Sequence, residues 1–377
     1  MTRVVHVLGE TTVGGAENQA LYLLRALRDR GLELELVFFR KGCQHERFAA
    51  LGVPMHQIHT RGRMATDWHR RAWAARELIT TFRPDILHTW LYETHLIGLL
   101  AALGRPQTRV LIAHRSGLGV PRSGRHLWAL RLLRHRIDHA LANSHAGAEV
   151  LTQLGLVGDR VSVIPNGLPI DRVAVTRERT AVRAELSIEP DAPVVCAVTR
   201  PNVAKDLPTL FGAFHVLRSV RPEARLVLIG PTAQELRHFG TELPEGAQAI
   251  GFRDQPADYM SASDIIAISS RTEGHSNVAA EGLMLGMPVA TTNTGEHPAL
   301  VRQAGGRVVP IGRSDALGAA FLELLEHPPQ RLDVRAVAER TLSIDAVADA
   351  TVALYAWLLS APLTPESDVS GSCKGSR

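Results

Sequence analysis

The stretch DIIAISSRTEGHSNVAAEGLMLGMPVATT, residues 264–292, contains a complete strand–helix–strand unit. DIIAIS (264–269) is a short apolar run that predicts a buried strand, and PVATT (288–292) predicts the next strand. Between them, Ser276 or Asn277 is placed to cap a helix of about nine residues. Strands joined by a helix favour parallel pairing in a sheet that is covered on both faces.

The same alternation of apolar strands and amphipathic helices continues along the whole chain. Predicted strands cover residues 3–8, 34–39, 85–89, 109–114, 139–143 and 161–165, and then 194–198, 225–230, 264–269, 288–292 and 307–311. A polar, proline-bearing segment, residues 177–193, separates the two series. We therefore predict an α/β fold with two sequential doubly wound units, covering residues 1–176 and 177–343. Helix 344–360 follows, and residues 361–377 read as a disordered tail.

Composition limits the class of protein. The 377 residues are 45% hydrophobic, which is enough for a sizeable core, and no apolar run approaches the ~20 residues that span a bilayer. The first residues do not resemble a secretory signal, and three widely spaced cysteines indicate neither a disulfide framework nor a zinc site. We expect a cytoplasmic protein.

Charge is unevenly distributed between the two halves. Residues 1–180 have a net charge of +10 and the remainder a net charge of −6. Segment 122–136, RSGRHLWALRLLRHR, is a basic amphipathic pattern. It is compatible with peripheral contact to an anionic membrane at its inner face, or with an ordinary core helix whose charged side is solvated. The scattered arginines form no basic and aromatic stripe, so we expect no nucleic-acid partner.

Candidate ligand residues follow the strands, because open parallel sheets bind ligands outside the carboxyl ends of their strands. Gly14 and Gly15 would let the backbone approach a ligand at a helix N-terminus. Arg200 and Lys205 follow strand 194–198, and Lys205 is one of three lysines among 42 basic residues. Two fixed cations there would suit a diphosphate.

Two glutamates, Glu273 and Glu281, lie eight positions apart after strand 264–269. Each carboxylate can accept hydrogen bonds from the neighbouring hydroxyls of a sugar, so the pair suits an activated sugar. The backbone amides of residues 275–278, at the start of the helix, would then point at a phosphate oxygen.

This E-x7-E arrangement resembles the donor site of retaining GT-B glycosyltransferases, most closely glycosyltransferase family four (glycosyl transferases group 1). The resemblance extends over nearly the whole chain, through Gly14-Gly15-Ala16-Glu17, Asn166-Gly167, Arg200 with Lys205, and Gly286-x-Pro288-Val289. It implies two Rossmann-like units facing across a cleft, the N-terminal one for the acceptor and the C-terminal one for the nucleotide sugar. The last helix would cross back to the first unit.

The resemblance also implies roles for individual residues. Arg200 and Lys205 would bind the diphosphate, Glu281 the ribose and Glu273 the donor hexose. The amides of Gly274, His275, Ser276 and Asn277 would complete the phosphate cradle, and His114 would lie near the anomeric centre. The sugar nucleotide is a substrate, and neither a cofactor nor a metal is implied.

The chain departs from the family pattern at two single positions and in one segment. Thr199 and Asp206 stand where glycines are usual, and segment 294–299 has one glycine of an expected pair and Ala299 where glutamate is common. Because that segment helps to hold the donor in the family, its departures put the identity of the donor in doubt more than the activity.

The implied reaction is metal-independent, retaining transfer of a hexose from a nucleotide sugar, with UDP as the expected nucleotide, to a hydroxyl of a glycan, lipid-linked or small-molecule acceptor. Two alternatives remain open. One is a catalytically silent sugar-nucleotide-binding protein, and the other is a nucleotide-sugar epimerase with a GT-B-like fold.

Overall fold

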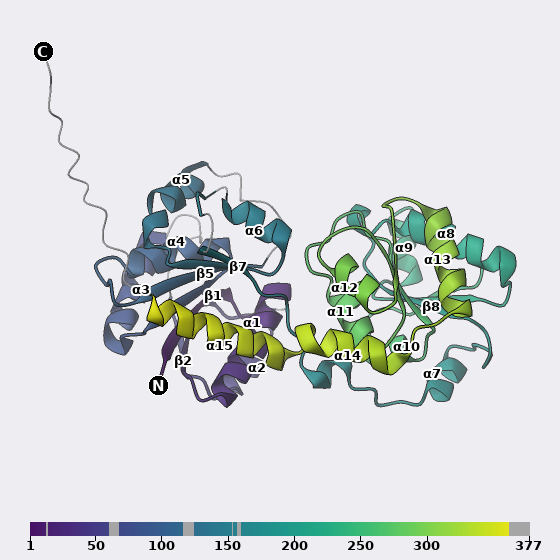
Figure 1. The fold of residues 1–377 in the computed structure, drawn as a ribbon, viewed down its shortest axis with the longest axis horizontal. Helices are drawn as coiled ribbons and strands as arrows, with labels where there is room; N and C mark the ends of the chain where they lie inside the picture. Colours follow the sequence, from purple (N-terminus) through teal and green to yellow (C-terminus); the bar gives the residue numbers. More distant parts are fainter. Residues whose placement is uncertain (13, 60–67, 116–123, 153, 157–159, 362–377) are drawn as a thin grey trace, which may run out of the picture.

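The computed structural model describes residues 1–12, 14–59, 68–115, 124–152, 154–156 and 160–361, which form two units side by side (Figure 1). Most of the predicted tail, residues 362–377, lies outside the described residues. Each unit is built on one parallel sheet, as the strand–helix alternation predicts. No helix in the described part of the chain combines the length and apolarity needed to cross a membrane.

The two sheets have the same kind of strand order. Among the described residues, the first runs β3-β2-β1-β4-β5-β6-β7 and the second β10-β9-β8-β11-β12-β13. The strands are β1 (Arg3–Glu10), β2 (Glu33–Arg40), β3 (Met55–Gln57), β4 (Ile86–Trp90), β5 (Arg109–His114), β6 (His139–Ala142), β7 (Val161–Val163), β8 (Val194–Val198), β9 (Arg225–Ile229), β10 (Ala247–Ala249), β11 (Ile265–Ile268), β12 (Val289–Thr292) and β13 (Arg307–Val309). The order reverses beside β1 and beside β8, and ligands of such folds bind at these switch points.

Helices cover both faces of each sheet. In β1, Val4 and Leu8 pack with the core beneath α1 and α15, whereas Val5 and Val7 pack with α3 and α4 on the opposite face. The helices are α1 (Gly15–Asp29), α2 (His45–Ala49), α3 (Trp68–Phe82), α4 (Tyr92–Ala101), α5 (Gly124–Leu132), α6 (His145–Thr152), α7 (Arg179–Glu185), α8 (Leu207–Val220), α9 (Ala233–His238), α10 (Pro256–Ser261), α11 (Asn277–Met284), α12 (His297–Gln303), α13 (Ser314–Glu326), α14 (Arg331–Leu342) and α15 (Ile344–Ser360).

Helix α15 crosses from the C-terminal unit to the N-terminal one, as predicted for the last helix (Figure 1). Arg30, just after α1, donates to Asp349 (2.7 Å) and Asp345 (3.1 Å) on α15. Further along the helix, the buried Tyr355 hydroxyl lies 2.7 Å from Nδ1 of His88 in the centre of the first sheet. The end of the chain therefore packs as part of the first unit.

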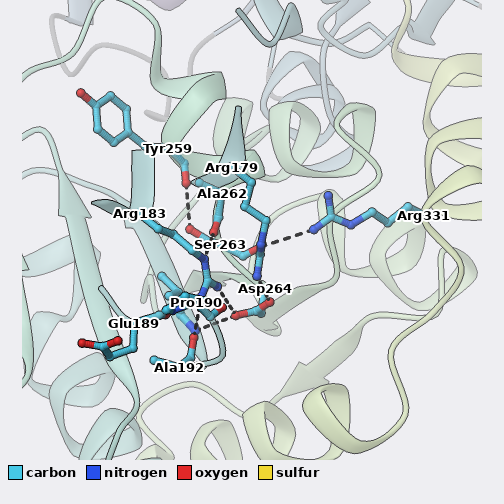
Figure 2. A network of polar contacts seen from close by, with 11 residues as sticks. Arg179, Arg183, Glu189, Pro190, Ala192, Tyr259, Ala262, Ser263, Asp264 and Arg331 are labelled. Carbon is cyan, nitrogen blue, oxygen red and sulfur yellow. Dashed lines mark hydrogen bonds and ion pairs between the residues drawn. The ribbon is translucent and has the colours of Figure 1, made fainter. Parts of the chain in front are cut away.

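A polar network fastens α7 to the amino ends of β8 and β11 (Figure 2). The carboxylate of Asp264 accepts hydrogen bonds from the Val194 N–H (2.8 Å), Arg179 (2.6 Å) and Arg183 (2.9 Å). Arg183 is buried and also donates to the carbonyl of Ala192 (2.9 Å). Because the network lies at the end of the sheet opposite the carboxyl edge, its role is to stabilise the unit.

The structure adds two short edge strands, β3 and β10, that the sequence analysis missed. Their sequences, MHQ and AQA, are three residues long and are not apolar runs. The basic amphipathic pattern of residues 122–136 does not form one helix to its end: α5 ends at Leu132, and a short 3-10 turn, Arg134–Arg136, follows. The limits of the units at residues 176 and 343 stay a prediction.

Candidate active site

The candidate site lies at the carboxyl ends of β8 and β11, the switch point of the second sheet. After β8, a single 3-10 turn (Val203–Lys205) is capped by the Asn202 side chain, which accepts from the Lys205 N–H (3.0 Å). Two hydrogen bonds attach this turn to the loop after β11: Ser269 Oγ donates to the Lys205 carbonyl (2.7 Å), and the Arg271 N–H donates to the Ala204 carbonyl (2.8 Å). Two loops that are 64 residues apart at the Ser269–Lys205 hydrogen bond therefore form one surface.

Lys205 and Glu273, which were predicted separately, form a direct ion pair. Lys205 Nζ lies 2.5 Å from Glu273 Oε1, and the Ser270 hydroxyl donates to the same oxygen (2.7 Å). Both charged side chains are mostly buried. Each charge is thus neutralised by the other, so a bound phosphate and a bound sugar would have to replace or share this contact.

The N-terminus of α11 follows Glu273 closely in the chain. Ser276 is the N-cap residue, as predicted, and its hydroxyl accepts from the Ala279 N–H (3.4 Å). The first N–H groups of a helix have no acceptor within the helix, and the helix dipole adds partial positive charge there. Oxygens of a phosphate could therefore bind to this helix end.

Glu281 is buried inside α11 and pairs with a residue that the sequence analysis missed. Arg172 Nε lies 3.0 Å from Glu281 Oε1. Burial raises the pKa of the Glu281 carboxyl, and the Arg172 charge acts in the opposite direction. No sequence signal distinguishes Arg172, because arginine makes up nearly all of the basic residues.

Arg172 also lines a groove of about 930 Å³ between the two units. Its other walls include Tyr22 and Arg25 of α1 and the C-terminal residues Phe252 and Asp254. Pockets for small molecules commonly have volumes of ~300–1,000 Å³. The groove is therefore large enough for a nucleotide-sized ligand. Glu281 does not line it, and Arg172 is the residue that joins the groove to Glu281.

The remaining predicted residues are divided between the units. Arg200, exposed after β8, has no carboxylate partner among the described residues, so its charge is available to a ligand. Gly14 and Gly15 lie at the start of α1 on the N-terminal unit. A Cβ on Gly15 would meet no atom within 4 Å, so its backbone is open to approach, whereas Gly14 packs against the Glu17 side chain.

His114, the last residue of β5, is buried on the N-terminal unit. The next residue, Arg115, donates to Asn166 Oδ1 (3.0 Å) and lies over the Trp90 ring. Burial, helped by the charges of His297 and Arg115, lowers the pKa of His275 to about 4. The two units therefore come close enough here for charge on one to act on the other.

The structure explains one of the departures from the family pattern. Asp206, where glycine is usual, has φ +47° in the left-handed region that glycine adopts most easily. Its carboxylate accepts hydrogen bonds from Thr209 Oγ1 (2.8 Å) and pairs with Arg271 Nε (2.9 Å). These contacts stabilise the strained backbone, so the loop of Lys205 keeps its shape without glycine.

Comparison with protein families gives two matches. The model for Glycosyltransferase Family 4 matches residues 13–172, and the model for Glycosyl transferases group 1 matches residues 192–327.

Curated relatives carry transferase names. The chain is 28% identical over 182 residues to a GDP-mannose-dependent monoacylated alpha-(1-6)-phosphatidylinositol monomannoside mannosyltransferase of Corynebacterium glutamicum, covering 45% of this chain and 48% of that protein. It is 28% identical over 240 residues to a D-inositol 3-phosphate glycosyltransferase of Streptomyces scabiei, covering 58% of this chain and 53% of that protein. The lipopolysaccharide core biosynthesis glycosyltransferase LpsE of Rhizobium meliloti is 25% identical over 354 residues, covering 91% and 96%. The chain thus spans about half the length of the first two relatives and nearly all of the third.

Solved structures share the fold. HepE of Anabaena in complex with UDP superposes with a TM-score of 0.78 at 19% identity, covering 95% of this chain and 100% of that one. A glycosyltransferase from Rickettsia africae superposes with a TM-score of 0.80 at 15% identity, covering 96% and 99%. With the two family models spanning most of its length, the chain belongs to the glycosyltransferases of Family 4 and group 1 and has their GT-B fold of two Rossmann-like units.

Proposed function

We propose that the protein transfers a hexose from a UDP-linked sugar to a hydroxyl of a glycan, lipid-linked or small-molecule acceptor, with retention of anomeric configuration and without a metal. The observation that carries this proposal is the Lys205–Glu273 ion pair beside the N-terminus of α11, at the switch point of the second sheet. A cation and a helix N-terminus suit a diphosphate, and a carboxylate suits sugar hydroxyls. The UDP assignment is supported by HepE, whose structure is described as a complex with UDP.

The predicted residues of the C-terminal unit each have a role in this reaction. Arg200, Lys205 and the amides of residues 274–277 neutralise the diphosphate, whose negative charge grows as it departs. Glu281 accepts hydrogen bonds from the ribose and Glu273 from the hexose. When the phosphate takes over Lys205, the Glu273 carboxylate is released for the sugar, so the ion pair holds both groups next to the place where they act.

The transfer step balances without a further reactant. The bond between the anomeric carbon and the phosphate oxygen breaks, and a bond to the acceptor oxygen forms on the same face. The acceptor proton moves to the departing phosphate oxygen, and UDP leaves. His114 lies beside the anomeric centre in this arrangement, and the facing sides of the two units orient the two substrates.

The test is a panel of UDP-, GDP- and ADP-sugars, measured by thermal shift and by nucleotide release with cell-extract acceptors. Lys205→Ala and Glu273→Ala are each expected to lose most turnover and remain folded. Lys41→Ala and Glu242→Ala, exposed residues of the same types, serve as matched controls. Release that does not depend on Glu273 would contradict the site assignment. Binding without any release would favour a silent binding protein, and sugar isomerisation without an acceptor would favour an epimerase.

We also propose that α5 contacts an anionic membrane surface that carries the acceptor. Trp128 is 66% exposed and Leu132 58% exposed on a helix that is followed by the basic turn Arg134–Arg136, while Leu130 is buried. Exposed apolar side chains flanked by arginines suit the interface of an anionic bilayer. Leu132→Gln is expected to weaken flotation with anionic vesicles at low salt, and Leu332→Gln, an exposed leucine of the C-terminal unit, is expected not to. Wild-type protein that fails to float would disprove the contact.

A further inference from the structure

Segment 294–299, which departs from the family pattern, makes a contact between the two units. Glu296 follows the one glycine of this segment, Gly295, and its Oε1 accepts hydrogen bonds from the N–H groups of His145 (2.7 Å) and Ala146 (3.3 Å). Both donors belong to the first turn of α6, on the N-terminal unit. A carboxylate of one unit therefore caps a helix of the other.

The contact fits the needs of the helix end. A helix leaves its first four N–H groups without an acceptor inside the helix; at α6 the Ser144 hydroxyl accepts from the Gly147 N–H (3.0 Å), and Glu296 accepts from two of the others. The positive end of the helix dipole further favours a carboxylate at this place. A glycine at position 296 would have no side chain that could make this contact.

The backbone of the same segment supports the turn that carries Glu273. The Glu296 N–H donates to the Gly274 carbonyl (3.1 Å), and the Thr294 hydroxyl accepts from the Glu273 N–H (3.3 Å). Gly295 has φ +71°, and a Cβ there would lie 2.4 Å from the Gly274 oxygen, so this glycine packs directly against the turn. The segment thus contacts the Glu273 turn on one side and α6 on the other.

We propose that Glu296 is a positioning residue that fixes the Glu273 turn relative to the N-terminal unit and so holds the two substrate sites in register. The inference rests on the proposed function, because it assigns donor and acceptor to different units. The charged groups proposed to hold the donor, Arg200, Lys205, Glu273 and Glu281, all lie on the C-terminal unit. Loss of the cap is therefore expected to slow transfer more than it weakens donor affinity.

The experiment is a double-mutant cycle between Glu296→Ala and His145→Pro. Proline is tolerated at the first position of a helix and removes the N–H from which Glu296 accepts a hydrogen bond. The control His145→Ala removes the imidazole and keeps this N–H. A helix cap contributes ~1 kcal/mol, so each partner variant is expected to lower kcat by about fivefold with the donor Kd unchanged. The double variant is expected to be no slower than either single one.

Additive effects, a kcat of Glu296→Ala equal to wild type, or an equal loss in His145→Ala would overturn the proposal. The thermal unfolding midpoint and the radius of gyration in solution are measured on the same proteins. If the double variant changes these two quantities no more than either single variant does, Glu296 and the His145 N–H are in contact, and this holds even if the wild type transfers no sugar. In that case the proposed function fails while the contact stands, so the two failures are distinguishable.

Discussion

At the scale of single residues, the buried histidines near the site predict how stability depends on pH. Burial lowers the pKa of His275 and of His297 to about 4, from an ordinary value near 6.5. The unfolded chain therefore binds protons between about pH 6.5 and 4 that the folded protein does not. The free energy of unfolding must fall as the pH falls through this range, by up to ~1.4 kcal/mol per pH unit for each histidine.

His297→Gln tests this dependence, because glutamine can keep the contact that His297 Nε2 makes with Thr291 Oγ1 (2.7 Å). Urea unfolding at pH 7 and pH 5 should show a smaller loss of stability for this variant than for wild type. His238→Gln, an exposed histidine on α9, is the control. An identical loss for His297→Gln and wild type would show that His297 does not take part in the pH dependence.

The sequence predicts the members of the site better than their partners. Strand ends and residue types single out Lys205, Glu273 and the Ser276 cap, and the structure brings all three to one switch point. That Lys205 pairs with Glu273, and Glu281 with Arg172, depends on loop geometry that no spacing in the sequence encodes. Backbone conformation is equally hidden at position 206, where the sequence shows only a missing glycine.

At the scale of elements, the polar network at the base of the second unit predicts a stability effect without a loss of function (Figure 2). Arg183→Met would leave Asp264 without its buried partner and the Ala192 carbonyl without a donor. Removing one member of a buried ionic network costs ~2–4 kcal/mol. Because the network lies at the amino ends of β8 and β11, donor affinity at 20 °C should be unchanged.

Chemical denaturation of this variant measures its free energy of unfolding, and donor titration measures its donor affinity. Arg313→Met is the matched control, because Arg313 pairs with Asp315 on the exposed surface, where an ion pair adds little stability. Equal losses in the two variants would show that the network adds no more than a surface pair.

Long elements are predictable and short ones are not. The apolar pattern of residues 344–360 coincides with α15, and residues 109–114 coincide with β5. The edge strands β3 and β10 bury too little apolar surface to leave a pattern in three residues, and main-chain pairing with β2 and β9 forms them instead. The end of α5 at Leu132 was also missed, because the basic amphipathic pattern continues through the break.

At the scale of the whole molecule, the sequence predicts two units but not how they touch. The contacts between them use single side chains, such as Glu296, which binds the start of α6, and Arg172, which binds Glu281 of α11. The relative placement of the units sets the roles of these side chains. Asn166-Gly167 was noted only as part of the family resemblance. In the structure it lies where the chain passes between the units, and this position leads to a last prediction.

Gly167 lies between α1 and the start of α15, the helix that crosses back to the first unit. Its N–H and carbonyl bind the Gln19 side chain of α1 (2.8 Å each), and the neighbouring Leu168 pairs with Leu342 and Ile344. A Cβ at position 167 would lie 2.9 Å from Ile344 Cδ1 and 3.0 Å from Ile344 Cα, at the start of α15. A side chain here must push α15 away from α1.

Gly167→Val is therefore expected to lower stability by ~1–3 kcal/mol, the usual cost of overpacking, and to change the relative placement of the units. Small-angle scattering and calorimetry should register both effects, while donor binding to the C-terminal unit stays as in wild type. Ile344→Ala removes Cδ1, one of the three atoms that a Cβ at position 167 would crowd, so the double variant should recover part of the stability. Scattering and unfolding curves of Gly167→Val that match wild type would mean that the crossing is loose enough to admit a side chain, and that Gly167 does not fix how the units meet.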